Sequence, residues 1–95
     1  MERGRKMIEN SYKTSCGCIH YFVNIIDKQK ITLVFLPGLT ADHRLFEKQI
    51  EYFERKQNVF VWDAPSHALS RPFTNNYSLS DMAEWLDKIL AKEEI

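Results

Sequence analysis

Two short stretches of the sequence hold residues that could take part in chemistry. The first is Pro37-Gly38-Leu39, which follows the apolar run at residues 31–36. The second is residues 63–70, Asp-Ala-Pro-Ser-His-Ala-Leu-Ser, which follows the apolar run at residues 58–62. A glycine turn leaves the main chain bare, and fixed backbone N–H donors stabilise the negative oxygen that develops in acyl transfer. The first stretch therefore suggests an anion-stabilising turn, and the alternative is that Pro37-Gly38 simply links a strand to a helix.

The serine and histidine in the second stretch do not form a catalytic pair by position alone. Ser66 and His67 are adjacent, and neighbouring side chains on extended backbone point to opposite sides. No Gly-x-Ser-x-Gly frame surrounds Ser66, so the turn that exposes a nucleophilic serine is not indicated here. His20 and His43 are interpreted as a strand-surface and a helix-start histidine. We therefore predict no catalytic residue in this chain.

Metal and cofactor sites are not indicated either. Cys16 and Cys18 flank a single glycine, and no second Cys or His pair stands at a ligand spacing. Structural metal sites need about four such ligands, so the two cysteines are interpreted as reduced turn residues. The turn after residues 31–36 also lacks a Gly-rich phosphate loop. We expect neither a metal nor a cofactor.

Composition narrows the class of protein. The 95 residues allow one domain, and 44% apolar with 27% charged residues is typical of a globular protein. Lys plus Arg equals Asp plus Glu at 13 each, so no field of one sign attracts nucleic acid or an anionic membrane. Neither a signal peptide nor an apolar run of membrane-spanning length is present in the sequence. We expect a cytoplasmic protein with no nucleic-acid or membrane partner, a flexible N-terminus at residues 1–7 and a domain at residues 8–95.

The first half of the chain predicts strands. Residues 8–15 and 19–26 are rich in β-branched and aromatic types and are separated by a Cys-Gly-Cys reversal, which predicts an antiparallel hairpin. Residues 31–36 are nearly all apolar, which is typical of a strand buried on both faces inside a parallel sheet. Such a strand is too apolar for a solvent-facing sheet edge.

The second half predicts two helices around one more strand. Asp42 could cap a helix in which Phe46, Ile50 and Phe53 share one face. A buried strand follows at residues 58–62, which completes a βαβ unit. The capping box Ser78-Leu-Ser-Asp81 then starts another helix. Its expected apolar stripe comprises Leu79, Met82, Leu86 and Ile89, flanked by Trp85 and Leu90.

These elements give the order β-β-β-α-β-α. The fold class is α/β: an N-terminal β-hairpin followed by a βαβα unit. A helix in an alternating chain normally returns to a further parallel strand, so we expect this to be the incomplete, opening part of a larger sheet.

Three separated segments resemble one known family. The segments TLVFLPGLTADHRLFEKQIEYF, NVFVWDAPSHALSRP and YSLSDMAEWLDKIL are similar, in order and spacing, to the N-terminal part of an α/β-hydrolase, a serine hydrolase or esterase-like protein. The resemblance implies that Gly38 is the tight-turn glycine and Leu39 an oxyanion-hole N–H donor, with Pro37 where the family often has His.

The same resemblance implies a supporting role for the second stretch. Residues 63–70 are similar to the family's Asp-x-Pro-Gly-His-Gly-x-Ser loop, so Asp63, Pro65, His67 and Ser70 are expected to support the site without supplying the nucleophile. Both loop glycines are replaced, by Ser66 and by Ala68. If these positions require a positive φ, each side chain costs about 1 kcal/mol or more.

The resemblance leaves two functions open. In the first, the chain is the N-terminal fragment of an enzyme that hydrolyses an ester or related acyl bond of a small-molecule substrate. Its Ser-His-Asp triad would lie outside this chain, so we expect the isolated chain to be inactive. In the second, the chain is a non-catalytic α/β fragment that self-associates, or binds a partner, through an open sheet edge. Esterase, lipase, peptidase and C–C hydrolase activities are not separated by these residues.

Overall fold

Four strands and two α-helices form the described part of the chain, which comprises residues 7–37, 43–65, 70–71 and 77–95 of a computed structural model. The strands are β1 (Ile8–Lys13), β2 (Cys18–Asn24), β3 (Thr32–Phe35) and β4 (Asn58–Trp62). The helices are α1 (Glu47–Phe53), which follows the 3-10 turn η1 (His43–Phe46), and α2 (Leu79–Lys92). The predicted element order and the α/β class are confirmed.

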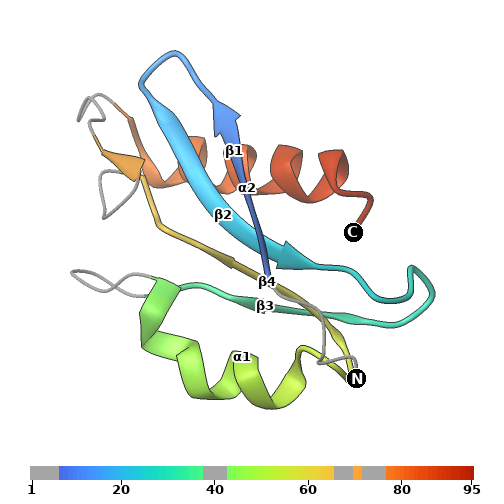
Figure 1. The fold of residues 1–95 in the computed structure, drawn as a ribbon. Coiled ribbons are helices and arrows are strands. Elements are labelled where there is room, and N and C mark those ends of the chain that lie inside the picture. The colour runs from blue at the N-terminus through green and yellow to red at the C-terminus, as the bar shows by residue number, and fades with distance from the viewer. Residues whose placement is uncertain (1–6, 38–42, 66–69, 72–76) are drawn as a thin grey trace.

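The strands form one mixed sheet in the order β1-β2-β4-β3 (Figure 1). β1 and β2 are the predicted antiparallel hairpin, and β2 also pairs antiparallel with β4. β3 and β4 are parallel and are joined through α1. The hairpin reverses at Gly17, whose φ of 155° favours glycine. The two flanking cysteines are free thiols.

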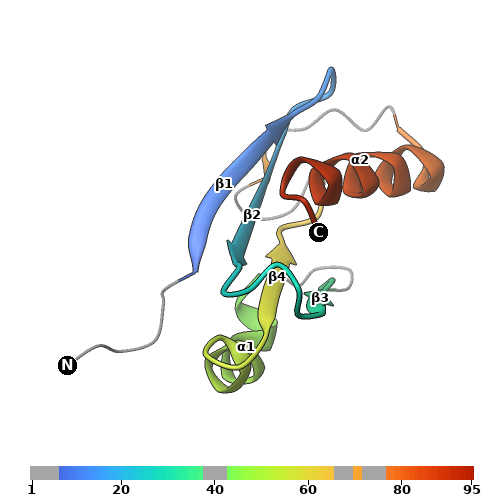
Figure 2. The ribbon, with the colours of Figure 1, turned by 90° about the vertical axis from the view of Figure 1, so that its right-hand side faces the viewer.

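The helices cover opposite faces of this sheet, and Figure 2 shows them on different sides of β4. Successive strand residues point to opposite faces. Val59 and Val61 of β4 pack with Ile50 of α1, whereas Phe60 and Trp62 pack with Ile89 of α2. This explains why every residue of β4 is buried. The prediction that residues 58–62 form a buried strand is confirmed.

The helix predicted to begin at Asp42 starts differently. Asp42 lies outside the described residues, and the chain first forms the 3-10 turn η1, so that α1 begins only at Glu47. Its N-cap residue is Phe46, which makes no side-chain capping hydrogen bond. The predicted apolar face is confirmed, because Phe46 and Phe53 both pack against the cluster around Ile50.

The capping box of α2 is present as predicted. The Ser78 hydroxyl accepts from the Asp81 backbone N–H at 3.2 Å, and the Asp81 carboxylate accepts from the Ser78 N–H at 2.9 Å. Met82, Trp85, Leu86 and Leu90 pack around the sheet with the buried Ile89, which confirms most of the predicted stripe. Leu79 is the exception, with 82% of its surface exposed. It is the first residue of the helix, one turn before Met82, and does not reach the sheet.

The apolar segment at residues 31–36 occupies an unexpected position. Only Thr32–Phe35 form a strand, and within the described residues this strand pairs with β4 alone. It is therefore an edge strand, and Ile31, Val34 and Leu36 are 69%, 37% and 46% exposed. The prediction of a strand buried on both faces is wrong for the described sheet, whereas the open edge expected of an incomplete sheet is present. Phe35 is partly buried and packs against Phe46 with ring centroids 4.9 Å apart.

The end of α2 is hydrogen-bonded to the hairpin. The Tyr21 hydroxyl and the Asn10 side-chain amide both donate to Glu93 Oε2, at 2.6 and 3.1 Å. The Lys92 ammonium donates to the Ser11 carbonyl at 3.1 Å. Burial and the neighbouring Glu93 carboxylate raise the pKa of the Tyr21 hydroxyl, because both disfavour a second negative charge. The two ends of the described chain are therefore held to each other.

Candidate functional site

The segments that follow β3 and β4 meet at one edge of the sheet. Parallel strands end on the same side, and ligand sites of open α/β sheets lie beyond these carboxyl ends. Pro37, which follows β3, is buried, and so are Asp63, Ala64 and Pro65, which follow β4. The described residues at this edge are therefore part of a packed structure, with a carboxylate inside it.

The buried carboxylate of Asp63 is bound by His43, the first residue of η1. Asp63 Oδ1 accepts the backbone N–H of His43 at 2.7 Å and lies 2.8 Å from its Nδ1. A carboxylate only accepts hydrogen bonds, so we infer that Nδ1 carries a proton. Hydrogen bonds to a charged partner stabilise by about 1.5–3 kcal/mol each. The pair thus joins the segment after β4 to the start of η1.

Ser70 is also buried, and it bridges two backbone segments. Its Oγ accepts from the His20 backbone N–H at 2.8 Å and donates to the Asp63 carbonyl at 2.5 Å. The Asp63 N–H in turn donates to the His20 carbonyl at 2.9 Å, which extends the β2–β4 ladder by one bond. The hydroxyl therefore completes hydrogen bonding at the point where β4 leaves the sheet.

A tyrosine fixes the other side of the same segment. The Tyr77 hydroxyl donates to the Pro65 carbonyl at 3.1 Å. The Tyr77 ring lies 5.5 Å, centroid to centroid, from the ring of Trp85 in α2. The residues on either side of positions 66–69 are thus attached to β2 and to α2.

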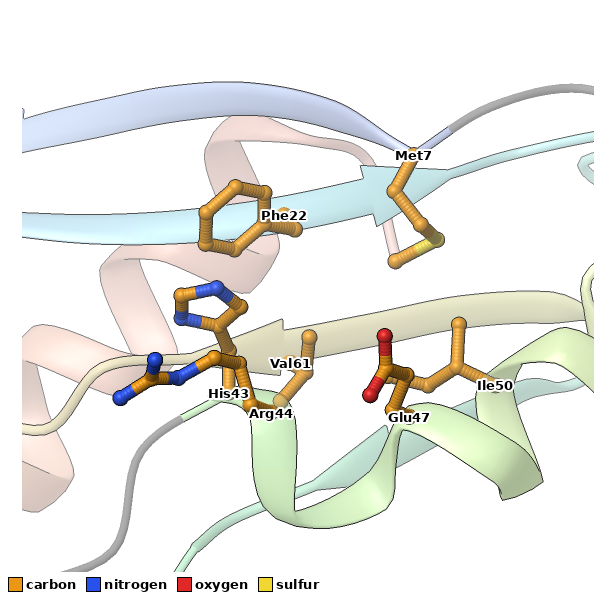
Figure 3. Close-up of a pocket in the computed structure, with 7 residues that line it drawn as sticks. All are labelled: Met7, Phe22, His43, Arg44, Glu47, Ile50 and Val61. Atoms are coloured by element: carbon orange, nitrogen blue, oxygen red, sulfur yellow. The ribbon is translucent and has the colours of Figure 1, made fainter.

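A pocket of about 200 Å³ lies on the α1 face of the sheet, beside this edge. Figure 3 shows the residues that line it: Met7, Phe22, His43, Arg44, Glu47, Ile50 and Val61. His43 belongs both to the pocket and to the pair with Asp63, and its ring lies 4.3 Å from the Phe22 ring, centroid to centroid. Among the described residues, no group of three or more His, Cys, Asp or Glu could hold a metal ion. No helix in the described part of the chain has the length and apolarity to cross a membrane.

The sequence at residues 31–93 matches the family model described as alpha/beta hydrolase fold. The chain belongs to the α/β-hydrolase fold family. The match begins just before β3 and ends just after α2, so it includes both segments at the carboxyl edge and the helix that covers the other face.

Solved structures share this α/β-hydrolase fold. A bacterial membrane phospholipase A, described as a virulence factor, superposes with a TM-score of 0.72 and 21% identity over 90% of this chain. A candidate lipase from Acinetobacter baumannii gives a TM-score of 0.69 and 22% identity, also over 90% of this chain. The chain spans only 27% and 28% of the lengths of these two proteins. No curated protein matches the sequence.

The structure brings together some of the residues expected to form an α/β-hydrolase site. Asp63, Pro65 and Ser70 lie in one hydrogen-bonded segment after β4, and their supporting role stays a prediction. The expected oxyanion-hole residues Gly38 and Leu39, and the loop residue His67, lie outside the described residues. Their roles stay predictions.

The interaction of His43 with Asp63 was not predicted. His43 was placed at a helix start, and it does begin η1. A signal was nevertheless available in the sequence. Because β3 and β4 are parallel neighbours, residues that follow each of them reach the same edge of the sheet. A histidine after one strand and an acid after the other can therefore pair.

Proposed function

We propose that this chain supplies the oxyanion-hole side of a serine hydrolase that cleaves an ester or related acyl bond of a small-molecule substrate. In this proposal the backbone N–H of Leu39, at the turn made by Gly38, stabilises the negative oxygen of the tetrahedral intermediate. The nucleophilic Ser, the acid and the His lie outside these 95 residues.

The family match over residues 31–93 carries this proposal. It is supported by the names of two proteins of the same fold, a phospholipase A and a candidate lipase. It is also supported by the buried Asp63, Pro65 and Ser70 segment, which bonds the end of β4 to β2 and to the start of η1. The sequence contains no Gly-x-Ser-x-Gly motif, so the isolated chain is expected to be inactive, and the cytoplasmic location stays a prediction.

The test uses a longer polypeptide that continues residues 1–95 into a Gly-x-Ser-x-Gly strand. It should hydrolyse p-nitrophenyl esters and be labelled on serine by a fluorophosphonate, whereas the 95-residue chain should do neither. Leu39→Pro removes the proposed N–H donor and should lower kcat by about 10²–10³-fold. Leu39→Ala keeps the N–H and is the matched control. Equal kcat values for the two variants would exclude Leu39 as the donor, and absence of both turnover and labelling would exclude the hydrolase.

A second candidate function is association through the open edge of the sheet. The observation that favours it is β3, which lies at the edge of the described sheet with Val34 and Leu36 exposed. Exposed edge strands can pair with a strand of another chain. Sedimentation velocity of the 95-residue chain should then show a dimer that Val34→Lys dissociates, while Leu45→Lys, an exposed apolar position in η1, leaves it intact. A monomer at all concentrations would rule out self-association.

A further inference from the structure

The pocket on the α1 face has mostly apolar walls, and its volume suits a ligand with a single ring. Met7, Phe22, Ile50 and Val61 form these walls, and the pocket volume is about 200 Å³. An engineered apolar cavity of about 150 Å³ is large enough to bind benzene. A molecule with one six-membered ring and a small substituent would therefore fill this pocket.

One polar group in this pocket is held in a defined state by its buried neighbour. Asp63 Oδ1 lies 2.8 Å from Nδ1 of His43, which places a proton on that nitrogen, and in a neutral imidazole the other nitrogen carries none. Nε2 is then a hydrogen-bond acceptor, and it has no hydrogen-bond partner among the described residues. Figure 3 shows this second ring nitrogen on the side of the ring nearer Phe22. Contact with the Phe22 ring and the bond from Nδ1 to Asp63 keep the imidazole in place.

The charged groups that line the pocket, Glu47 and Arg44, indicate which ligand charge the pocket favours. The Glu47 carboxylate is directed toward the space between Met7 and Val61, whereas the Arg44 guanidinium extends away from the other lining residues (Figure 3). A carboxylate in the wall repels an anion and, like Nε2, accepts hydrogen bonds. Both polar groups that face the pocket thus favour a ligand that donates.

We propose that this pocket binds a small neutral aromatic molecule that carries a hydrogen-bond donor, of the phenol class. The ring of the ligand lies against the apolar walls, and its hydroxyl donates to Nε2 of His43. The Asp63 carboxylate strengthens this bond by polarising the imidazole through Nδ1. This binding site lies on the α1 face, and it does not depend on the proposed acyl hydrolysis.

The test compares two probes of nearly equal size, phenol and toluene, of which only phenol can donate. The 15N-labelled 95-residue chain is titrated with each probe in turn at pH 8.5. We expect both probes to shift the amide signals of Ile50 and Val61, with phenol binding about five- to tenfold more tightly, as one hydrogen bond to a buried acceptor provides.

Two variants separate the imidazole from the rest of the chain. His43→Phe keeps a ring against Phe22 but removes the acceptor, and it should abolish the preference for phenol. His20→Phe is the matched control, because His20 also contacts a carboxylate, that of Glu9, but does not line the pocket. It should retain the full preference.

Three results would overturn the proposal. They are equal affinity for the two probes in the wild-type chain, signal shifts confined to residues outside the pocket, and a phenol preference that survives in His43→Phe. If His43→Phe does not fold, the hydrogen bond is tested by a 15N measurement on the imidazole of the wild-type chain. Phenol, but not toluene, should then shift the 15N resonance of His43 Nε2, and an unchanged resonance excludes the hydrogen bond.

Discussion

Removal of the Ser70 hydroxyl is expected to destabilise the fold by far more than its size suggests. The side chain is fully buried, and its oxygen bonds both the His20 N–H and the Asp63 carbonyl. In Ser70→Ala these two backbone groups lose that partner at a position where β4 leaves the sheet. A buried polar group without a hydrogen bond costs about 1–3 kcal/mol. The two together give an expected loss of about 2–6 kcal/mol.

Such a loss is large for a domain of this size. Small domains have unfolding free energies near the lower end of about 5–15 kcal/mol. Each kcal/mol corresponds to roughly 4–8 °C in Tm for 60–100 residues, so we expect Tm to fall by at least about 8 °C. Urea unfolding followed by far-ultraviolet circular dichroism gives the free energy, and equal slopes in wild type and variant show that the same surface unfolds.

The control is Ser11→Ala, at an exposed position of β1. Exposed substitutions of this kind usually change stability by less than about 0.5 kcal/mol. If Ser70→Ala also stays within about 0.5 kcal/mol of wild type at equal slope, the hydroxyl bridge does not support the end of β4 in solution. The hydrogen-bond argument for the supporting segment would then be wrong.

Three further changes probe α2 and its contacts. Ile89→Ala should lower the unfolding free energy by about 2–5 kcal/mol, because Ile89 is fully buried, whereas the exposed Leu79→Ala should not, as urea unfolding would show. Ser78→Ala should cost about 1 kcal/mol through loss of the N-cap and should lower helicity measured by circular dichroism. The raised pKa of Tyr21 means that the folded state holds this proton more tightly than the unfolded state. Stability should therefore be unaffected below about pH 10 and fall above it, and Tyr21→Phe should remove that fall in a pH series of unfolding curves.

The parts of the fold that sequence patterns predicted are those decided by local chemistry. Residues 59–62 have apolar side chains for both faces, and they lie in the strand that both helices cover. The pairing of Ser78 with Asp81 depends only on their spacing of three residues within one helix. The same holds for the shared face of Ile50 and Phe53. Period and spacing are properties of the sequence itself, so these features can be predicted from it.

The features that were missed depend on neighbours that periodicity does not specify. Leu79 continues the helical stripe, yet it lies before the point where α2 meets the sheet. The exposure of Val34 depends on which strands stand beside β3, and its own side chain cannot indicate that. His43 and Asp63 are separated by 20 residues and meet because two parallel strands end together. Part of the candidate site could be predicted only through family resemblance, because the contacts that form it are long-range.

The bonds between α2 and the hairpin also bear on how fast the molecule folds. Asn10 and Glu93 are separated by 83 residues, and Ser11 and Lys92 by 81. Closing so long a loop has an entropic cost that must be met before the contacts at its ends can contribute. Chains dominated by such distant pairings fold slowly compared with helical bundles. During synthesis the hairpin therefore remains without these contacts until α2 has left the ribosome, and its strands are open to wrong partners in that interval.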